Sequence, residues 1–387
     1  MNLLYKVGSR YENPHKTGFA HLFEHLMFGG SEHIPDYDTP LQVAGGENNA
    51  FTSNDITNYY LTLPHTNIET GFWLESDRML GLAFSQESLD VQRNVVIEEF
   101  KERYLNQPYG DLWLKILPLA YRVHPYSWPT IGKEIEHIER ATLKDVKEFF
   151  FSFYAPNNAI LVIAGNISLE RTKELCANWF ADIPTRKIPE PAYEVEPPQT
   201  APRIETVSAD VPLNMIVKAY HMPGRMDPGF YETDLLSDIL GSGKSSRLYQ
   251  GLVKDKKLFS EIECYISADV EPGLLMIEGK LLPDTSMENA DKEIQNLLQE
   301  TLHSIRNEEV EKVKNKTETT IRFNEISILN RAMKLAYCEM LGDIDLANRE
   351  ADDYMGVTTP DIVSWGKKIL TENNCSTIHY FSQHDSK

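Results

Sequence analysis

The chain has 387 residues, more than a single hydrophobic core usually holds, so we expect at least two domains. Asp and Glu outnumber Lys and Arg by 58 to 38, which gives a formal net charge of -20. This charge argues against nucleic acid as a partner, because binding a phosphate backbone requires clustered cations. The sequence contains no run of about twenty apolar residues, so we expect no membrane-spanning helix.

The compartment is left open by the sequence. The opening residues, "MNLLYKVGSR", lack the apolar centre of a signal peptide. As written the chain is expected to be cytoplasmic, and a periplasmic location remains open if a leader was removed before residue 1. The cysteines are far apart and form no C-x-x-C pair, so we interpret them as core thiols: Cys176, Cys264, Cys338 and Cys375.

Residues 20–30, "AHLFEHLMFGG", combine a greasy helical pattern with three ionisable side chains. Positions i, i+3 and i+4 share one face of a helix, so His21, Glu24 and His25 project together. Two imidazoles one turn apart can chelate a divalent metal, and a carboxylate beside them can deprotonate water. Isolated histidines such as His33 are better explained as ordinary polar residues. Three ionisable groups on an apolar helix need a partner, which favours a metal.

A catalytic zinc ion takes three protein ligands and leaves one position open, so a third ligand should come from elsewhere. The helical stretch "RNVVIEEFKERY" offers Glu98 and Glu99. Glu99 follows Val95 and Val96 at helical spacing, which places it beside the apolar stripe. We therefore predict Glu99 as the ligand. Glu98, on a more polar face, is a candidate for supporting the ligands or is simply exposed to solvent.

Two segments separated by 216 residues resemble each other. "TLKDVKEFFFSFYAPNNAILVIAG" begins at Thr142, and "TTPDIVSWGKKILTENNCSTIHYF" begins at Thr358. Each predicts a capped helix, a turn at paired asparagines and a β-branched strand. Between them, residues 183–203 are proline-rich and predict an extended linker. The repeat and the linker favour a duplicated domain.

We expect a zinc-binding N-terminal domain over residues 1–182, the linker over 183–203 and a C-terminal domain over 204–387. Strand-like runs such as "LNMIVKAYHM" are interspersed with longer helical stretches such as "DKEIQNLLQETLHSIRNEEVEKVKNKTETTI". The helices cluster between strands without strict βαβ alternation. The predicted class is therefore α+β, with two domains that each have a mostly antiparallel sheet and helices on one face.

Five stretches together resemble the M16 metallopeptidases, the group that includes pitrilysin, insulin-degrading enzyme and the mitochondrial processing peptidase. They are "TGFAHLFEHLMFGGSEHI", "GGENNAFTSNDITNYYLTLP", "RNVVIEEF", "HPYSWPTIG" and "YAPNNAILVIAGNI". The likeness runs from about Tyr5 to Gly165 and continues more loosely through the second half. The H-x-x-E-H order is that of the inverted zinc helix. The size is similar to that of the short bacterial branch.

The resemblance implies one zinc ion per chain, held by His21, His25 and Glu99, with Glu24 as general base. It implies two homologous domains with the fold shared by M16 peptidases and LuxS metalloenzymes. It also implies a chamber closed by two chains around a peptide. In the family, the strand that corresponds to "NNAFTSNDITNYY" binds substrate as an added strand, which places Asn49 and Ala50 at the peptide.

The sequence departs from the family in the groups that assist zinc. Active members carry an Arg and a Tyr, spaced R-x6-Y, in the C-terminal domain, where they stabilise charge on the attacked carbonyl. Aligned on "SSRLY", these positions hold Val253 and Ser260. Either a homologous partner chain supplies the pair, or neighbours take over in a homodimer: Arg247, Tyr249, Lys254 or Tyr265. The heterodimer is the favoured hypothesis.

Two smaller departures concern Gln92 and the first residues. Several relatives carry a glutamate where this chain has Gln92, one or two turns before the last ligand, so Gln92 is expected at most to support the ligands. Relatives usually have further strands before the segment equivalent to "LLYKVGSRYEN", so we expect a truncated start.

We predict a zinc-dependent endopeptidase subunit that cleaves peptides or unfolded segments. A self-sufficient homodimeric peptidase is one alternative. A non-catalytic peptide-binding or assembly subunit with structural zinc is another, and a closed four-ligand site would favour it.

Overall fold

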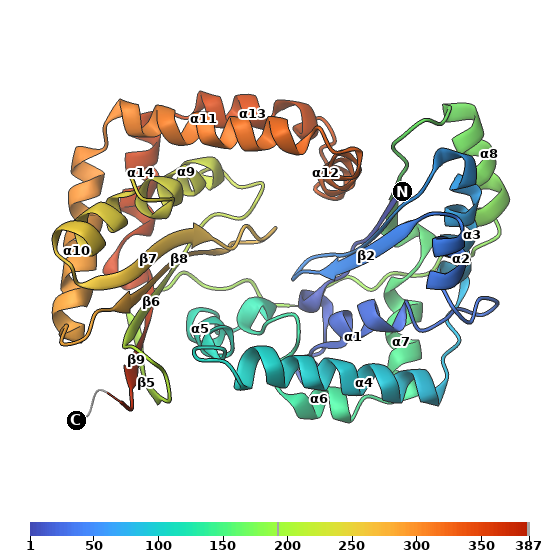
Figure 1. Ribbon diagram of the computed structural model, residues 1–387, viewed down its shortest axis with the longest axis horizontal. Coiled ribbons are helices and arrows are strands. Elements are labelled where there is room, and N and C mark those ends of the chain that lie inside the picture. Colours follow the sequence, from blue (N-terminus) through green and yellow to red (C-terminus); the bar gives the residue numbers. More distant parts are fainter. Residues whose placement is uncertain (192, 385–387) are drawn as a thin grey trace. The chain divides into compact units, whose positions relative to one another are not determined.

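The computed structural model describes residues 1–191 and 193–384, which divide into two compact units. Each unit contains one sheet, and Figure 1 shows the strands with their helices. The first unit comprises residues 1–106, 124–194 and 323–347. The second comprises residues 107–123, 195–322 and 348–387. Each unit therefore includes a segment that interrupts the sequence of the other.

The first sheet is antiparallel throughout and has the strand order β2-β3-β1-β4. Its strands are β1 (Asn2–Tyr5), β2 (Glu47–Thr52), β3 (Thr57–Thr62) and β4 (Ala159–Val162). Helices of this unit are α1 (Phe19–Leu26), α2 (Asp38–Val43), α3 (Ile68–Leu80), α4 (Gln86–Phe100), α6 (Ile135–Glu139), α7 (Leu143–Phe153), α8 (Leu169–Phe180) and α12 (Ile328–Met340). Strand β2 lies at one edge, where its outer backbone groups have no neighbouring strand among the described residues.

Both faces of the first sheet are covered. Successive residues of a strand point to opposite faces. Tyr5 of β1 contacts Tyr154, which stacks on Phe23 of α1. Leu4 packs instead with Ala336 of α12, a helix from the last quarter of the sequence. The expected layer of helices on one face is present, and α12 adds a helix to the other.

The second sheet has the strand order β5-β9-β6-β8-β7, with β5 and β9 parallel and the remaining pairs antiparallel. Its strands are β5 (Arg203–Ala209), β6 (Met215–His221), β7 (Phe259–Ile266), β8 (Leu274–Leu281) and β9 (Cys375–Ser382). The other helices are α5 (Leu112–Ala120), α9 (Phe230–Gly241), α10 (Met287–Ser304), α11 (Asn307–Asn324), α13 (Leu346–Gly356) and α14 (Thr359–Ile369). Most of them bury one large apolar cluster against the sheet.

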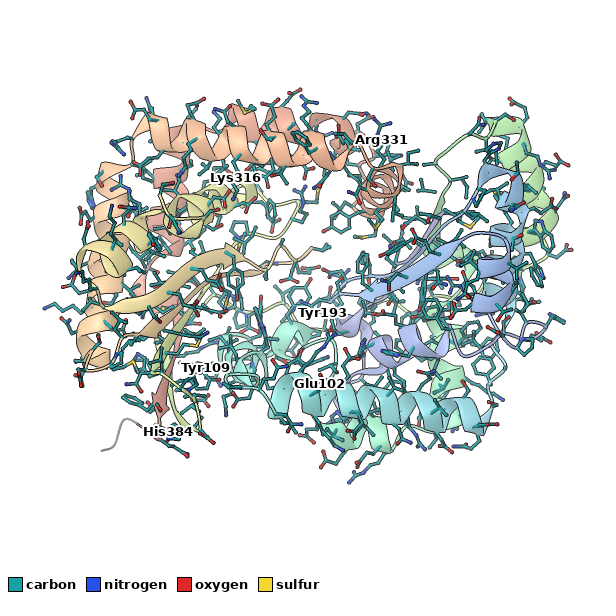
Figure 2. The ribbon with its side chains drawn as sticks, in the orientation of Figure 1. Glu102, Tyr109, Tyr193, Lys316, Arg331 and His384 are labelled. Atoms are coloured by element: carbon teal, nitrogen blue, oxygen red, sulfur yellow. The ribbon has the colours of Figure 1, made fainter. Side chains whose placement is uncertain are left out.

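Side-chain contacts attach the outer helices of the second unit to the rest of that unit. Lys316 of α11, labelled in Figure 2, pairs with Asp238 of α9 at 3.0 Å. Tyr109, also labelled, precedes α5; its hydroxyl donates to the carbonyl oxygen of Leu213 at 2.6 Å, and its ring contacts Tyr380 of β9. The two Tyr109 contacts hold the start of α5, which comes from the first third of the sequence, against the second sheet.

The 216-residue repeat recurs at the level of single hydrogen bonds. Thr142 with Asp145 and Thr358 with Asp361 each form a capping box, the reciprocal bonding that starts a helix. After α7 the side-chain amide of Asn158 donates to Phe153, and after α14 that of Asn374 donates to Ile369, both at 2.9 Å. Each asparagine thus closes the C-terminus of its helix before the following strand.

The structure confirms the predicted α+β class with two sheet-containing units. One predicted helical stretch is divided: α10 ends at Ser304 and α11 begins at Asn307. Ile305, with a ψ of 128°, leaves the helical conformation, and the backbone N–H of Arg306 donates to the Glu309 carboxylate. Between α8 and β5 the described residues form no helix or strand, as expected of a linker. The domain limits at 182 and 204 stay a prediction. None of the described helices is long and apolar enough to cross a membrane.

Candidate metal centre

Helix α1 begins at a tightly constrained turn. Gly18 has a φ of +87°, and a Cβ there would lie 2.5 Å from the carbonyl oxygen of Ile131, so only glycine fits. The buried Glu12 carboxylate accepts N–H bonds from Gly18 at 2.9 Å and Ala20 at 2.7 Å, and a third from the Trp128 indole at 3.1 Å. Glu12 therefore satisfies donors that the first turn of a helix leaves without partners.

One face of α1 is buried, and the other carries the ionisable side chains. Leu22 and Phe23 have no exposed surface, and Leu26 is nearly as buried. Phe23 packs against the rings of Phe149, within α7, and Tyr154, directly after it. This packing fixes the rotation of α1 about its axis, which directs the opposite face toward α4.

The structure brings His21, His25 and Glu99 together. Glu99 projects from α4, and its Oε2 lies 3.6 Å from Nε2 of each histidine. The candidate ligand atoms of the three residues, one from each, all lie within 4.8 Å of one another. Two imidazole nitrogens and a carboxylate oxygen form a donor set suited to a catalytic zinc ion. The residues present thus fit the metal that the sequence predicts.

The electrostatic setting favours the protonation states that a metal requires. Burial, reinforced by the neighbouring His25, lowers the pKa of His21 to about 4, so His21 is neutral at pH 7. The adjacent His25, whose Nε2 lies 3.6 Å from Glu99 Oε2, lowers the pKa of Glu99, despite its partial burial. Arg103 also pairs with Glu99 at 3.0 Å. A neutral imidazole and an ionised carboxylate are the ligand forms that bind a divalent cation.

Glu24 lies on the same face of α1 and contacts a hydroxyl of the first sheet. Thr52, the last residue of β2, donates from Oγ1 to Glu24 Oε2 at 2.6 Å. Burial raises the pKa of Glu24, and the Thr52 hydrogen bond opposes that shift. A carboxylate with a raised pKa is a stronger base than an ordinary glutamate at the same pH.

Asn49 and Ala50 lie on β2, the edge strand next to this cluster. They pair in register with Tyr60 and Tyr59 of β3. The N–H of Ala50 donates to the side-chain oxygen of Asn49 at 2.8 Å. Exposed backbone groups on an edge strand are those that an added peptide strand pairs with. Their contact with substrate stays a prediction.

Glu98 and Gln92 lie outside the cluster of His21, His25 and Glu99. The Glu98 side chain is 72% exposed and pairs with Lys101 at 2.8 Å. Gln92 is half-buried earlier on α4. The prediction that both valines mark the apolar stripe is wrong for one of them: Val96 is fully buried, whereas Val95 is 44% exposed.

In the second unit, the two positions that correspond to the Arg and the Tyr of the family hold Val253 and Ser260, and both side chains contact other parts of that unit. Val253 packs against the main apolar cluster, and Ser260 donates to the carbonyl oxygen of Lys280. Among the alternatives, Arg247 is engaged in paired hydrogen bonds to Glu309 at 2.6 and 2.7 Å. The remaining alternatives have these surroundings: the Tyr265 hydroxyl donates to Glu278, Lys254 contacts Gln250, and Tyr249 lines a cavity of about 300 Å³.

Two supporting residues were missed by reasoning from the sequence, Glu12 and Thr52. Each contacts α1 or its first turn from outside the helix, so helical spacing gives no signal for either. The segment "NNAFTSNDITNYY" predicts an edge strand, and nothing in its sequence connects Thr52 with Glu24.

The comparisons with known proteins identify a family. The family described as Insulinase (Peptidase family M16) matches residues 1–132, and Peptidase M16 inactive domain matches residues 140–317. A Helicobacter pylori protein named zinc protease PqqE is 34% identical over 306 residues, covering 77% of this chain and 68% of that protein. An uncharacterized zinc protease of Rickettsia bellii is 22% identical over 386 residues, covering 98% of this chain and 91% of the relative.

Solved structures share the fold along almost the entire chain. A protease from Helicobacter pylori has a TM-score of 0.92 at 29% identity, covering 98% of this chain and 93% of that one. Pitrilysin has a TM-score of 0.74 at 17% identity and covers 99% of this chain but 42% of its own. The fold and the matched sequences place the chain among the two-domain proteins related to insulinase. The chain belongs to the M16 family.

Proposed function

We propose that this chain is the zinc-bearing subunit of an M16 endopeptidase that cleaves peptides or unfolded segments. The observation that carries the proposal is the convergence of His21, His25 and Glu99 within 4.8 Å, with Glu24 on the same helix face. Zinc protease is also the name of the relatives described above.

The proposed chemistry assigns a separate task to each side chain. His21, His25 and Glu99 hold zinc, which when bound supplies Lewis acidity to the peptide carbonyl and to water. Glu24 accepts a proton from the attacking water and later returns it to the leaving amine. Strand β2 holds the peptide in extended form through its backbone, with Asn49 and Ala50 in contact.

A homologous second chain is proposed to supply the missing Arg and Tyr. The Val253 side chain has no hydrogen-bond donor, and the Ser260 hydroxyl donates to the carbonyl oxygen of Lys280, so neither replaces the family pair that stabilises a developing oxyanion. Arg247 is committed to Glu309, and Tyr265 to Glu278, which supports recruitment from a partner over replacement by neighbours. Closure of two such chains would form the chamber.

The test is hydrolysis of a quenched, unstructured peptide by the zinc-loaded chain, with a chelator control. Glu24→Gln should retain stoichiometric zinc and lose turnover, because the amide cannot accept the proton. Glu98→Gln is the matched control and should behave as wild type, since that exposed carboxylate lies outside the cluster. Turnover by Glu24→Gln at the wild-type rate would remove Glu24 from the mechanism.

The same assay distinguishes the possible assemblies. Zinc-bound protein with negligible turnover alone, activated by a homologue that has R-x6-Y but lacks H-x-x-E-H, is the expected result. Strong activity of the purified chain would favour the self-sufficient homodimer. Absence of activity with every such partner, together with a closed four-ligand zinc site, would favour the non-catalytic peptide-binding subunit.

A further inference from the structure

The hydrogen bond between Thr52 and Glu24 joins the edge strand to the proposed catalytic base. It measures 2.6 Å and connects residues 28 positions apart, with Thr52 on β2 and Glu24 on α1. A carboxylate on a flexible side chain has several rotamers, and a general base works only in those directed at its proton donor. A partner that fixes one carboxylate oxygen therefore limits where the other oxygen points.

The backbone around Thr52 is itself held in place. Thr52 pairs with Thr57 at the end of the β2–β3 hairpin. In the connecting turn, the Ser53 N–H donates to the carbonyl oxygen of Ile56 at 2.8 Å, and the Ser53 hydroxyl accepts from the N–H groups of Asp55 and Ile56. A β-branched side chain on an ordered strand has few accessible rotamers. The hydroxyl is thus presented to Glu24 from a rigid position.

We propose that Thr52 is a positioning residue for the M16 reaction. Its hydroxyl holds Oε2 of Glu24, leaving Oε1 to accept the proton of the attacking water. The inference rests on the proposed function, because it assigns Thr52 a part in orienting the base of that reaction. It adds a second task to β2: the strand proposed to bind the peptide also orients the group that activates water.

The experiment compares Thr52→Val, which keeps the side-chain shape and removes the hydroxyl, with Thr52→Ser, which keeps the hydroxyl. Thr62→Val is the matched control, because Thr62 lies on the same hairpin and its hydroxyl donates to a different carboxylate, Glu47, at 2.9 Å. All variants are loaded with zinc and assayed with the quenched peptide and whichever partner supports wild-type turnover.

Thr52→Val is expected to lower kcat about 10- to 100-fold, the range for losing a hydrogen bond to a charged group. KM should change little, zinc content should stay at one per chain, and Thr52→Ser should recover most of the rate. Thr62→Val should match wild type. A wild-type kcat in Thr52→Val, a loss confined to KM, or no recovery with serine would overturn the proposal.

Crystal structures of the zinc-loaded wild type and Thr52→Val give a readout that does not depend on turnover. The expected result is a Glu24 carboxylate that leaves its wild-type orientation or occupies several orientations in Thr52→Val and retains the wild-type orientation in Thr62→Val. An unchanged Glu24 in Thr52→Val would contradict the positioning role. If wild type is inactive with every partner, the proposed function fails, and the crystal structures still decide whether Thr52 orients Glu24.

Discussion

At the scale of single residues, the neighbouring carboxylates Glu98 and Glu99 show how one helical step separates two environments. Successive residues on a helix point about 100° apart. Glu99 reaches His21 and His25, while Glu98 faces solvent beside Lys101. Two chemically identical side chains on one helix should therefore differ sharply in their effect on metal binding.

We predict that Glu99→Gln weakens zinc affinity by more than the roughly 10- to 100-fold typical of losing an outer partner of a ligand. Glu98→Gln should leave the affinity near wild type, because it removes only an exposed ion pair. Competition with a chromogenic chelator measures both dissociation constants. Equal affinities in the two variants would remove Glu99 from the ligand set.

At the scale of elements, the position of α1 depends on Glu12. Burial raises the pKa of this carboxyl to about 8, against the opposing effect of its N–H donors. The folded protein therefore retains a proton that the unfolded chain releases near its ordinary pKa of about 4.3. Stability from this group is present at low pH and is lost as the pH rises through 8.

Glu12→Gln, which carries no titrating proton, is accordingly predicted to remove part of the pH dependence of stability. Between pH 5 and 8 the free energy of unfolding of the wild type should fall relative to that of the variant by an amount on the order of 3 kcal/mol. Urea unfolding of the metal-free proteins at the two pH values measures this difference. Parallel pH dependences would show that Glu12 titrates normally.

Much of the element structure could be predicted from local sequence. The capping residues Thr142 and Thr358 gave the starts of α7 and α14, and helical spacing gave the common face of His21 and His25. The residues that produce each of these signals lie within one or two helical turns of one another in the sequence. The Thr52 contact depends on strand register and helix rotation together, so no local pattern contains it.

At the scale of the whole molecule, the helices α5 and α12 do not follow the order of the sequence. Helix α12 lies late in the chain but packs on β1 and β4 of the first sheet, whereas α5 lies early but contacts β5, β6 and β9 of the second. Apolar periodicity can predict that each helix has a face to bury. It does not identify which sheet that face covers, because the choice depends on the path of the chain between distant segments.

The packing of α12 on the first sheet and of α5 on the second predicts which helices zinc will stabilise. Metal binding favours the folded form of the unit that contains the site, so openings of that unit become rarer. Zinc should slow amide hydrogen exchange in α1, α4 and β2, and also in α12, about 230 or more residues away in sequence. Helix α5 should be unaffected, although it follows Glu99 by only 13 residues.

Hydrogen exchange measured by mass spectrometry with and without zinc tests this pattern, and His21→Ala supplies the control in which added metal should change nothing. Protection of α12 without protection of α5 would show that the units defined by packing also open separately. Equal protection of both helices would mean that the two units open together. Protection that follows sequence order, reaching α5 but not α12, would contradict the packing of α12 on the first sheet, because a helix bound to that sheet must share its stabilisation.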